Sequence, residues 1–207
     1  MKSKKIFKAT FLVMVITIVS RFLGLIRDSL VAYYFGASAI TDAYKAAVMV
    51  PETLFTIIGL GVSTVFIPML SKIRYRDSKK KMFEFANNVI GILVILSLSI
   101  FILGNIIAPG FSRENMELAI NLTRISLINL LFMSINVCFL SMLQVCEDFV
   151  IPSILGMFFN APIILYLIIF KDVNILGVTI ANVIGNILRV VVQIPSLYRQ
   201  GYNIKFR

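Results

Sequence analysis

Charged side chains interrupt two long apolar stretches near the start of the chain. Arg21, Arg27 and Asp28 lie in the first stretch, and Asp42 and Glu52 lie in the second. An ionised group at membrane depth costs at least about 2.5 kcal/mol on insertion scales unless it finds water or a partner. Charges in these positions therefore indicate a site for a charged solute rather than a surface that faces lipid.

The polar residues of each stretch lie along one side of a predicted helix. At about 100° per residue, those of the first stretch fall within roughly 120°, and those of the second within about 100°. The two stripes are Thr17, Ser20, Arg21, Gly24, Arg27 and Asp28, and Asp42, Lys45, Glu52, Thr56, Gly59 and Ser63. If the stripes face each other, their charges offset one another and enclose a hydrated cleft, which we interpret as a solute pathway. The possible lining residues of this cleft are Ser20, Gly24, Lys45 and Glu52.

A purely structural role for these charges stays open. Arg21 and Asp28 would then form a buried ion pair that fixes helix packing, while Lys45 and Glu52 would reach toward a membrane surface. Charges that lie near predicted span ends are expected to reach toward a membrane surface. These are Arg124, Arg189 and Glu117.

The elements that position these residues follow from composition. Apolar and aromatic residues make up 59% of the 207 residues, charged residues make up 14%, and the mean hydropathy is +0.94. A soluble domain carries roughly 25% charged residues to cover its surface. The sequence therefore predicts an all-α, polytopic integral membrane protein.

Six apolar segments are long enough to cross about 30 Å of hydrocarbon, which takes roughly 20 helical residues. We predict spans at residues 6–35, 40–71, 82–108, 116–146, 150–170 and 174–198. The connections are short, so neighbouring helices run antiparallel and residues 1–207 form one compact bundle.

Lys and Arg residues gather between the apolar segments. Four lie at the N-terminus, six between residues 72 and 81 and three after Ser196, against two (Arg113 and Lys171) in the other connections. Basic loops stay in the cytoplasm, so we predict that both termini are cytoplasmic. The net charge of +10 is then a set of topology signals, and we expect no nucleic-acid partner.

The sequence lacks the residues that several kinds of chemistry require. The chain has no His, which excludes His-centred metal sites and a conventional catalytic triad. It also has no glycine-rich phosphate loop that ends in Lys-Ser or Lys-Thr. We therefore expect no enzyme activity, no cofactor and no metal.

The order of residues near the N-terminus resembles a known family. The matching run is Ser20-Arg21-Phe22-Leu23-Gly24-Leu25-Ile26-Arg27-Asp28, followed by Ala32, residues 35–37, residues 41–44 and Pro51. This run is similar to the start of the MviN/MurJ lipid II flippases, within the multidrug/oligosaccharidyl-lipid/polysaccharide exporter superfamily. The chain differs where family members often carry two arginines and a glutamate, at Phe55, Thr56 and Leu60.

The resemblance implies a flippase that moves an undecaprenyl-pyrophosphate-linked sugar between leaflets by alternating access of two lobes. It implies that Arg21, Arg27 and Asp42 line the central cavity. Our own hypothesis is that Arg21 and Arg27 bind the diphosphate, while Asp28 and Asp42 tune the field of the two arginines and pair with them when the site is empty. Guanidinium groups suit a diphosphate because they bind its oxygens in pairs and stay charged. Such flippases have about fourteen spans, so the chain matches one lobe and needs a second, from a longer chain or another subunit.

We hypothesise that the chain is the N-terminal lobe of a flippase for lipid II, the peptidoglycan precursor, in the bacterial cytoplasmic membrane. The expected partners are this lipid-linked oligosaccharide pyrophosphate and membrane lipids. Three alternatives stay open: a flippase for another polyprenyl-linked oligosaccharide such as a capsule or exopolysaccharide unit, a cation-coupled drug exporter of the same superfamily, and a non-transporting membrane scaffold.

Overall fold

A computed structural model describes residues 2–107 and 116–203 of the chain. Helices account for nearly all of these residues, and a π-helical segment, η1 (Val62–Phe66), joins two of them. The helices of the described residues are α1 (Lys2–Phe35), α2 (Ala39–Gly61), α3 (Ile67–Arg76), α4 (Lys79–Ile107), α5 (Glu117–Ser126), α6 (Asn129–Val145), α7 (Val150–Ile169) and α8 (Ile175–Arg199).

Six helical segments of the described residues are long and apolar enough to cross a membrane. They are Thr10–Phe35, Ala39–Arg76, Lys79–Ile107, Glu117–Val145, Val150–Ile169 and Ile175–Arg199. The predicted all-α membrane bundle is therefore confirmed. The predicted connection at residues 109–115, including Arg113, lies outside the described residues.

Two of the predicted helices are not uniform in the structure. The second continues through α2, η1 and α3, and Pro51 lies inside α2. The fourth consists of α5 and α6, which meet at a turn where the Ile128 amide donates to the Ile125 carbonyl over 3.3 Å. A π-helical segment inside an α-helix is rare and is often found at functional sites.

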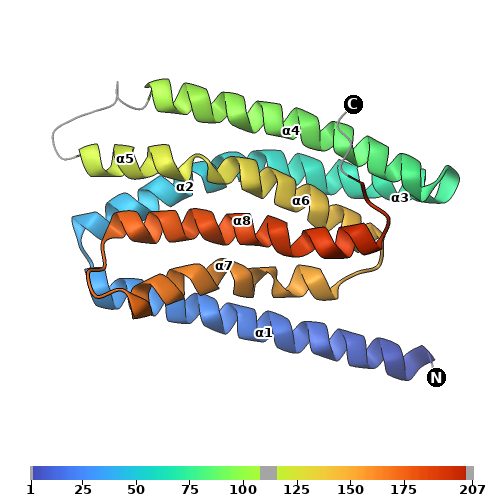
Figure 1. Cartoon of the computed structure of the whole chain (residues 1–207), viewed down its shortest axis with the longest axis horizontal. Coiled ribbons are helices and arrows are strands. Elements are labelled where there is room, and N and C mark those ends of the chain that lie inside the picture. The colour runs from blue at the N-terminus through green and yellow to red at the C-terminus, as the bar shows by residue number, and fades with distance from the viewer. Residues whose placement is uncertain (1, 108–115, 204–207) are drawn as a thin grey trace.

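The bundle is arranged so that α1 and α4 lie at opposite edges (Figure 1). Helix α1 packs mainly on α7, α7 packs on α8, and α4 packs on α6. Glycine allows α7 and α8 to approach closely, because a Cβ atom on Gly185 would lie 2.5 Å from the Phe159 carbonyl oxygen. Gly156 of α7 likewise leaves space for the Ser20 hydroxyl of α1. Small residues at helix crossings are typical of membrane bundles.

The start of α1, the turn between α3 and α4, and the end of α8 lie at the same end of the bundle (Figure 1). Basic residues of α3 and of the first turn of α4 gather at this end, which we call the basic end. The connections from α1 to α2 and from α7 to α8 lie at the opposite end.

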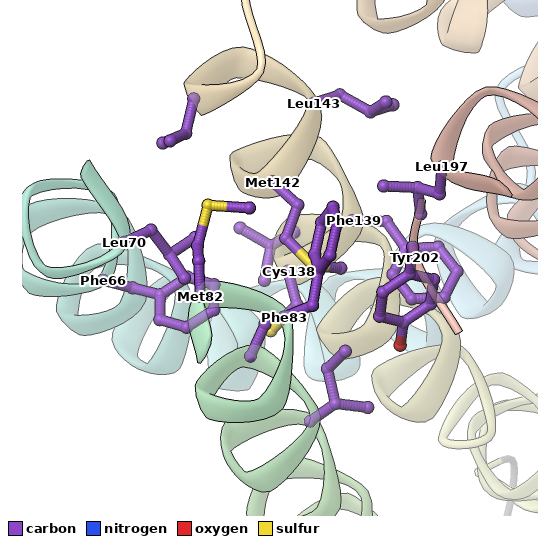
Figure 2. Packing of buried hydrophobic residues seen from close by; sticks show 14 of the residues in the cluster. Phe66, Leu70, Met82, Phe83, Cys138, Phe139, Met142, Leu143, Leu197 and Tyr202 are labelled. Carbon is purple, nitrogen blue, oxygen red and sulfur yellow. The ribbon is translucent and has the colours of Figure 1, made fainter. Parts of the chain in front are cut away.

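An apolar cluster packs α3, α4, α6 and α8 together near the basic end (Figure 2). Leu70, Met82 and Leu197 are fully buried there. Tyr202, which follows α8, donates its hydroxyl proton to Asn87 Oδ1 of α4. Burial raises the pKa of Tyr202 to about 12. Tyr202 and Asn203 are thus fixed against α4, since Asn87 Nδ2 also donates to the Asn203 carbonyl over 3.2 Å.

Gly185→Ala is expected to destabilise the protein, because the added methyl group meets the backbone of α7 and forces the helices apart. Overpacking of this kind costs about 1–3 kcal/mol, so the midpoint of thermal unfolding in detergent should fall by several degrees. Gly91→Ala is the matched control, because a Cβ atom there has no neighbour within 4 Å. An unchanged midpoint for Gly185→Ala would contradict the close packing of α7 and α8.

Candidate functional site

The second half of α1, the α1–α2 connection and the first half of α2 enclose a cavity of about 570 Å³. We call this space the charged cavity. Its polar and charged lining residues are Arg27, Asp28, Thr41, Asp42, Tyr44, Lys45, Glu52 and Asn182. Arg27 lies about 12 Å from the end of α1 at the usual helical rise, so the cavity extends well into the bundle.

Hydrogen bonds hold the turn at the mouth of the cavity. Gly36 has a φ of 61°, which favours glycine. Ser38 caps α2, because its hydroxyl oxygen accepts a hydrogen bond from the Thr41 amide over 3.4 Å. The Thr41 hydroxyl donates a hydrogen bond to the Gly36 carbonyl over 2.9 Å. Asp42 follows in the first turn of α2, where the helix dipole favours a negative charge. The turn therefore positions Asp42 at the cavity wall.

Arg27 is the most constrained charged side chain of the charged cavity. Its Nε and Nη2 atoms donate to Asp28 Oδ1 over 3.0 and 2.8 Å. Its Nη1 atom donates to Asn160 Oδ1 of α7 over 3.0 Å. The guanidinium carbon lies 5.4 Å from the centre of the Phe159 ring, within the range of cation–π attraction. Helix α7 thus holds the guanidinium in place, while Asp28 remains largely exposed.

The structure brings five of the eight expected site residues together on one cavity wall, namely Arg27, Asp28, Asp42, Lys45 and Glu52. The remaining three, Arg21, Ser20 and Gly24, do not line it.

Helix α7 explains why the stripe of α1 does not face α2 along its whole length. The Ser20 hydroxyl contacts Gly156 of α7, and the Ser20 carbonyl accepts a hydrogen bond from Asn160 Nδ2 at 3.4 Å. Gly24 also lies beside Asn160. The expected cleft between the two polar stripes therefore exists only where α1 ends and α2 begins, and Arg21 is exposed outside it.

The position of Arg189 in the structure differs from the one predicted from the sequence. It lies near the middle of α8 rather than at a span end, and it is half-buried. Its guanidinium carbon lies 3.9 Å from the centre of the Phe159 ring, and its Nη1 atom donates to Asn186 Oδ1 over 3.4 Å. The expectation that Arg189 reaches a membrane surface is thus wrong, because an aromatic ring and an amide hold it inside the bundle.

A row of amide side chains continues from the charged cavity into the bundle. Asn129 donates to Asn182 over 3.0 Å, and Asn186 donates to Asn129 over 3.0 Å. The sequence contains a signal for this row, because Asn182, Asn186, Arg189 and Gln193 recur at helical spacing on one side of α8. The polar stripes predicted from the sequence lie only on the first two spans, so this row was not predicted.

The chemistry available to the charged cavity is the binding of charge rather than bond cleavage. Guanidinium, ammonium and carboxylate groups share one partly dry space, where electrostatic forces act more strongly than in water. The only salt bridge that the described residues form in the cavity joins Arg27 and Asp28. An anionic group can replace Asp28 as the partner of Arg27, because both offer oxygen atoms to the same N–H groups.

The fold and the charged cavity define a multi-spanning helical membrane protein with a charged cavity between its helices. A sequence profile described as lipid II flippase MurJ matches residues 31–207. The chain therefore belongs to the MurJ lipid II flippase family.

Two relatives and one solved structure give the extent of the likeness. The chain is 32% identical to the probable lipid II flippase MurJ of Buchnera aphidicola subsp. Schizaphis graminum, over 94% of this chain and 40% of that protein. It is 31% identical to the lipid II flippase MurJ of Thermosipho africanus, over 94% of this chain and 42% of that protein. The solved structure, a lipid II flippase MurJ in an inward closed conformation, matches with a TM-score of 0.72 and 28% identity, over 95% of this chain and 43% of that one. The chain thus spans about two fifths of the length of these proteins.

Cysteine substitution tests the position of the charged cavity. Ala32→Cys and Asp42→Cys should react rapidly with an aqueous thiol reagent in membranes, because both positions are exposed and line the cavity. Ser97→Cys is the control and should react slowly, because Ser97 is fully buried against Ser134. The native Cys138 and Cys146 are buried and should add little background. Equal, slow reaction at all three positions would show that water does not reach the cavity.

Proposed function

We propose that residues 1–207 form the N-terminal lobe of a flippase that moves lipid II across the bacterial cytoplasmic membrane by alternating access. The observation that carries the proposal is the Arg27 guanidinium, which is held at the wall of the charged cavity by groups of α1 and α7. Membership of the MurJ family supports the choice of substrate. Lipid II carries a diphosphate, and a diphosphate in hydrocarbon requires fixed cations.

Arg27 and Arg21 bind the diphosphate in this proposal, and Asp28 and Asp42 tune their field. The Arg27–Asp28 pair represents the site without substrate, in which the Asp28 carboxylate is the partner of the Arg27 guanidinium. An arriving diphosphate displaces Asp28, which is exposed and free to turn toward water. Arg21 lies outside the charged cavity on an exposed part of α1. In this proposal it meets the substrate in a wider cleft that a second lobe completes.

A second lobe completes the transport pathway. The related flippases are more than twice as long as the part that this chain matches, and we propose that the partner lobe comes from a longer chain or another subunit. Membrane lipids surround the assembly. We propose that a membrane potential or cation gradient drives transport, with no catalytic step in this lobe.

Both termini face the cytoplasm in the proposed arrangement. The start of α1, the α3–α4 turn and the end of α8 share the basic end of the bundle (Figure 1). Basic loops remain on the cytoplasmic side, which supports this orientation. The charged cavity then lies nearer the outer leaflet, because it begins at the α1–α2 connection of the opposite end.

Arg27→Ala in the full-length protein is expected to abolish growth of cells depleted of their own lipid II flippase. Loss of one charge-assisted hydrogen-bonding partner costs roughly 1.5–3 kcal/mol, and here the substrate's charge also loses its partner inside the membrane. Arg27→Lys keeps the charge but not the paired geometry, so it should restore growth only in part.

Arg199→Ala is the matched control, since it removes an exposed cation at the end of α8. Each variant must be present in the membrane at the wild-type level. Normal growth with Arg27→Ala at that level would remove Arg27 from the mechanism.

A further inference from the structure

A second cation, the Arg189 guanidinium, lies next to the charged cavity. Arg189 of α8 and Arg27 of α1 both lie over the Phe159 ring, with guanidinium carbons 3.9 and 5.4 Å from its centre. Two like charges this close repel each other, and the repulsion is strong where water is scarce. The pair is favourable only when negative charge lies near both groups.

A small void of about 60 Å³ connects Arg189 with the charged cavity. The residues that line both spaces are Val48, Glu52, Phe159 and Asn182. A water molecule takes up roughly 30 Å³ of liquid, so a void of about 60 Å³ is too small for a diphosphate. A diphosphate that Arg189 binds must therefore lie at the boundary between the void and the charged cavity.

Glu52 occupies this boundary. Its carboxylate lies close enough to attract both Arg27 and Arg189. It forms no salt bridge with any of the residues that the structure describes. The residue is exposed and lines both the void and the charged cavity. Glu52 is thus a loosely held counter-charge for two tightly held guanidinium groups.

We propose that Arg189 is a second anion-binding residue of the charged cavity, and that Glu52 occupies its place until an anion arrives. This inference rests on the proposed function and extends it by naming a further residue that binds the diphosphate. The incoming anion repels Glu52 toward water and takes its position between Arg27 and Arg189. Phe159 and Asn186 keep the Arg189 guanidinium in place during the exchange.

The test measures binding of undecaprenyl pyrophosphate to the purified full-length protein in detergent, by microscale thermophoresis. Arg189→Gln should weaken binding roughly tenfold or more, because a charge-assisted hydrogen bond is lost. Arg189→Lys keeps the charge and should weaken binding less. Arg124→Gln, which removes an exposed arginine outside the cavity, should leave binding unchanged.

Glu52→Gln provides an outcome that a structural role of Arg189 does not predict. It should tighten binding several-fold, because it removes a competing negative charge and keeps the shape of the side chain. The gain should be smaller in the Arg189→Gln background, since Arg189 is then absent and only the repulsion is relieved. This difference is the coupling energy of a double-mutant cycle.

The outcomes separate the inference from the proposed function. Failure of the wild-type protein to bind undecaprenyl pyrophosphate would count against the proposed function. Wild-type binding that Arg189→Gln leaves unchanged would overturn the inference alone. If Arg189→Gln does not fold, Arg189→Lys and Glu52→Gln decide: unchanged binding with Arg189→Lys, together with unchanged or weaker binding with Glu52→Gln, would contradict the exchange.

Discussion

The structure depends on the cost of placing a guanidinium group inside an apolar bundle. An arginine at membrane depth must find water, a counter-charge or a polar partner. Arg27 finds all of these at one point: Asp28 beside it, Asn160 of α7 across from it, and the charged cavity in front of it. The packing of α1 on α7 follows from this need as well as from small residues, because Asn160 also donates to the backbone of α1 at Ser20.

The charged cavity and the amide row of α8 form one polar region. Asn182 belongs to both, and Phe159 separates them while contacting Arg27 and Arg189. Buried polar networks are favourable only when their members are satisfied. Hydrogen bonds between Asn129, Asn182 and Asn186 satisfy these three side chains, whereas the buried Gln193 Oε1 has no hydrogen-bond partner among the described residues. Helices α6 and α8 also contribute to the apolar cluster near the basic end (Figure 2), so the same helices carry the polar region and a buried apolar core.

The fold was largely predictable from sequence, because apolar segment length reports membrane spans directly. The site was predictable only in part. Periodicity gave the stripe that contains Arg27, but it gave no information on which neighbour each half of the stripe meets, so Ser20 and Gly24 were expected in the cleft. Arg189 was expected at a membrane surface because it lies near a predicted span end, although it shares a helical spacing with Asn182, Asn186 and Gln193. Its role depends on Phe159, a contact between helices that sequence spacing does not reveal.

Chemical restoration of Arg27 tests the central claim most directly. The full-length protein with Arg27→Cys would be placed in proteoliposomes, treated with a thiol reagent that attaches an aminoethyl group, and assayed for movement of lipid II between leaflets. Our account predicts that the positively charged adduct restores transport in part, as a lysine would, and that a neutral adduct of similar size does not. Equal recovery with both adducts, or efficient transport by the unmodified variant, would contradict a role for positive charge at this position.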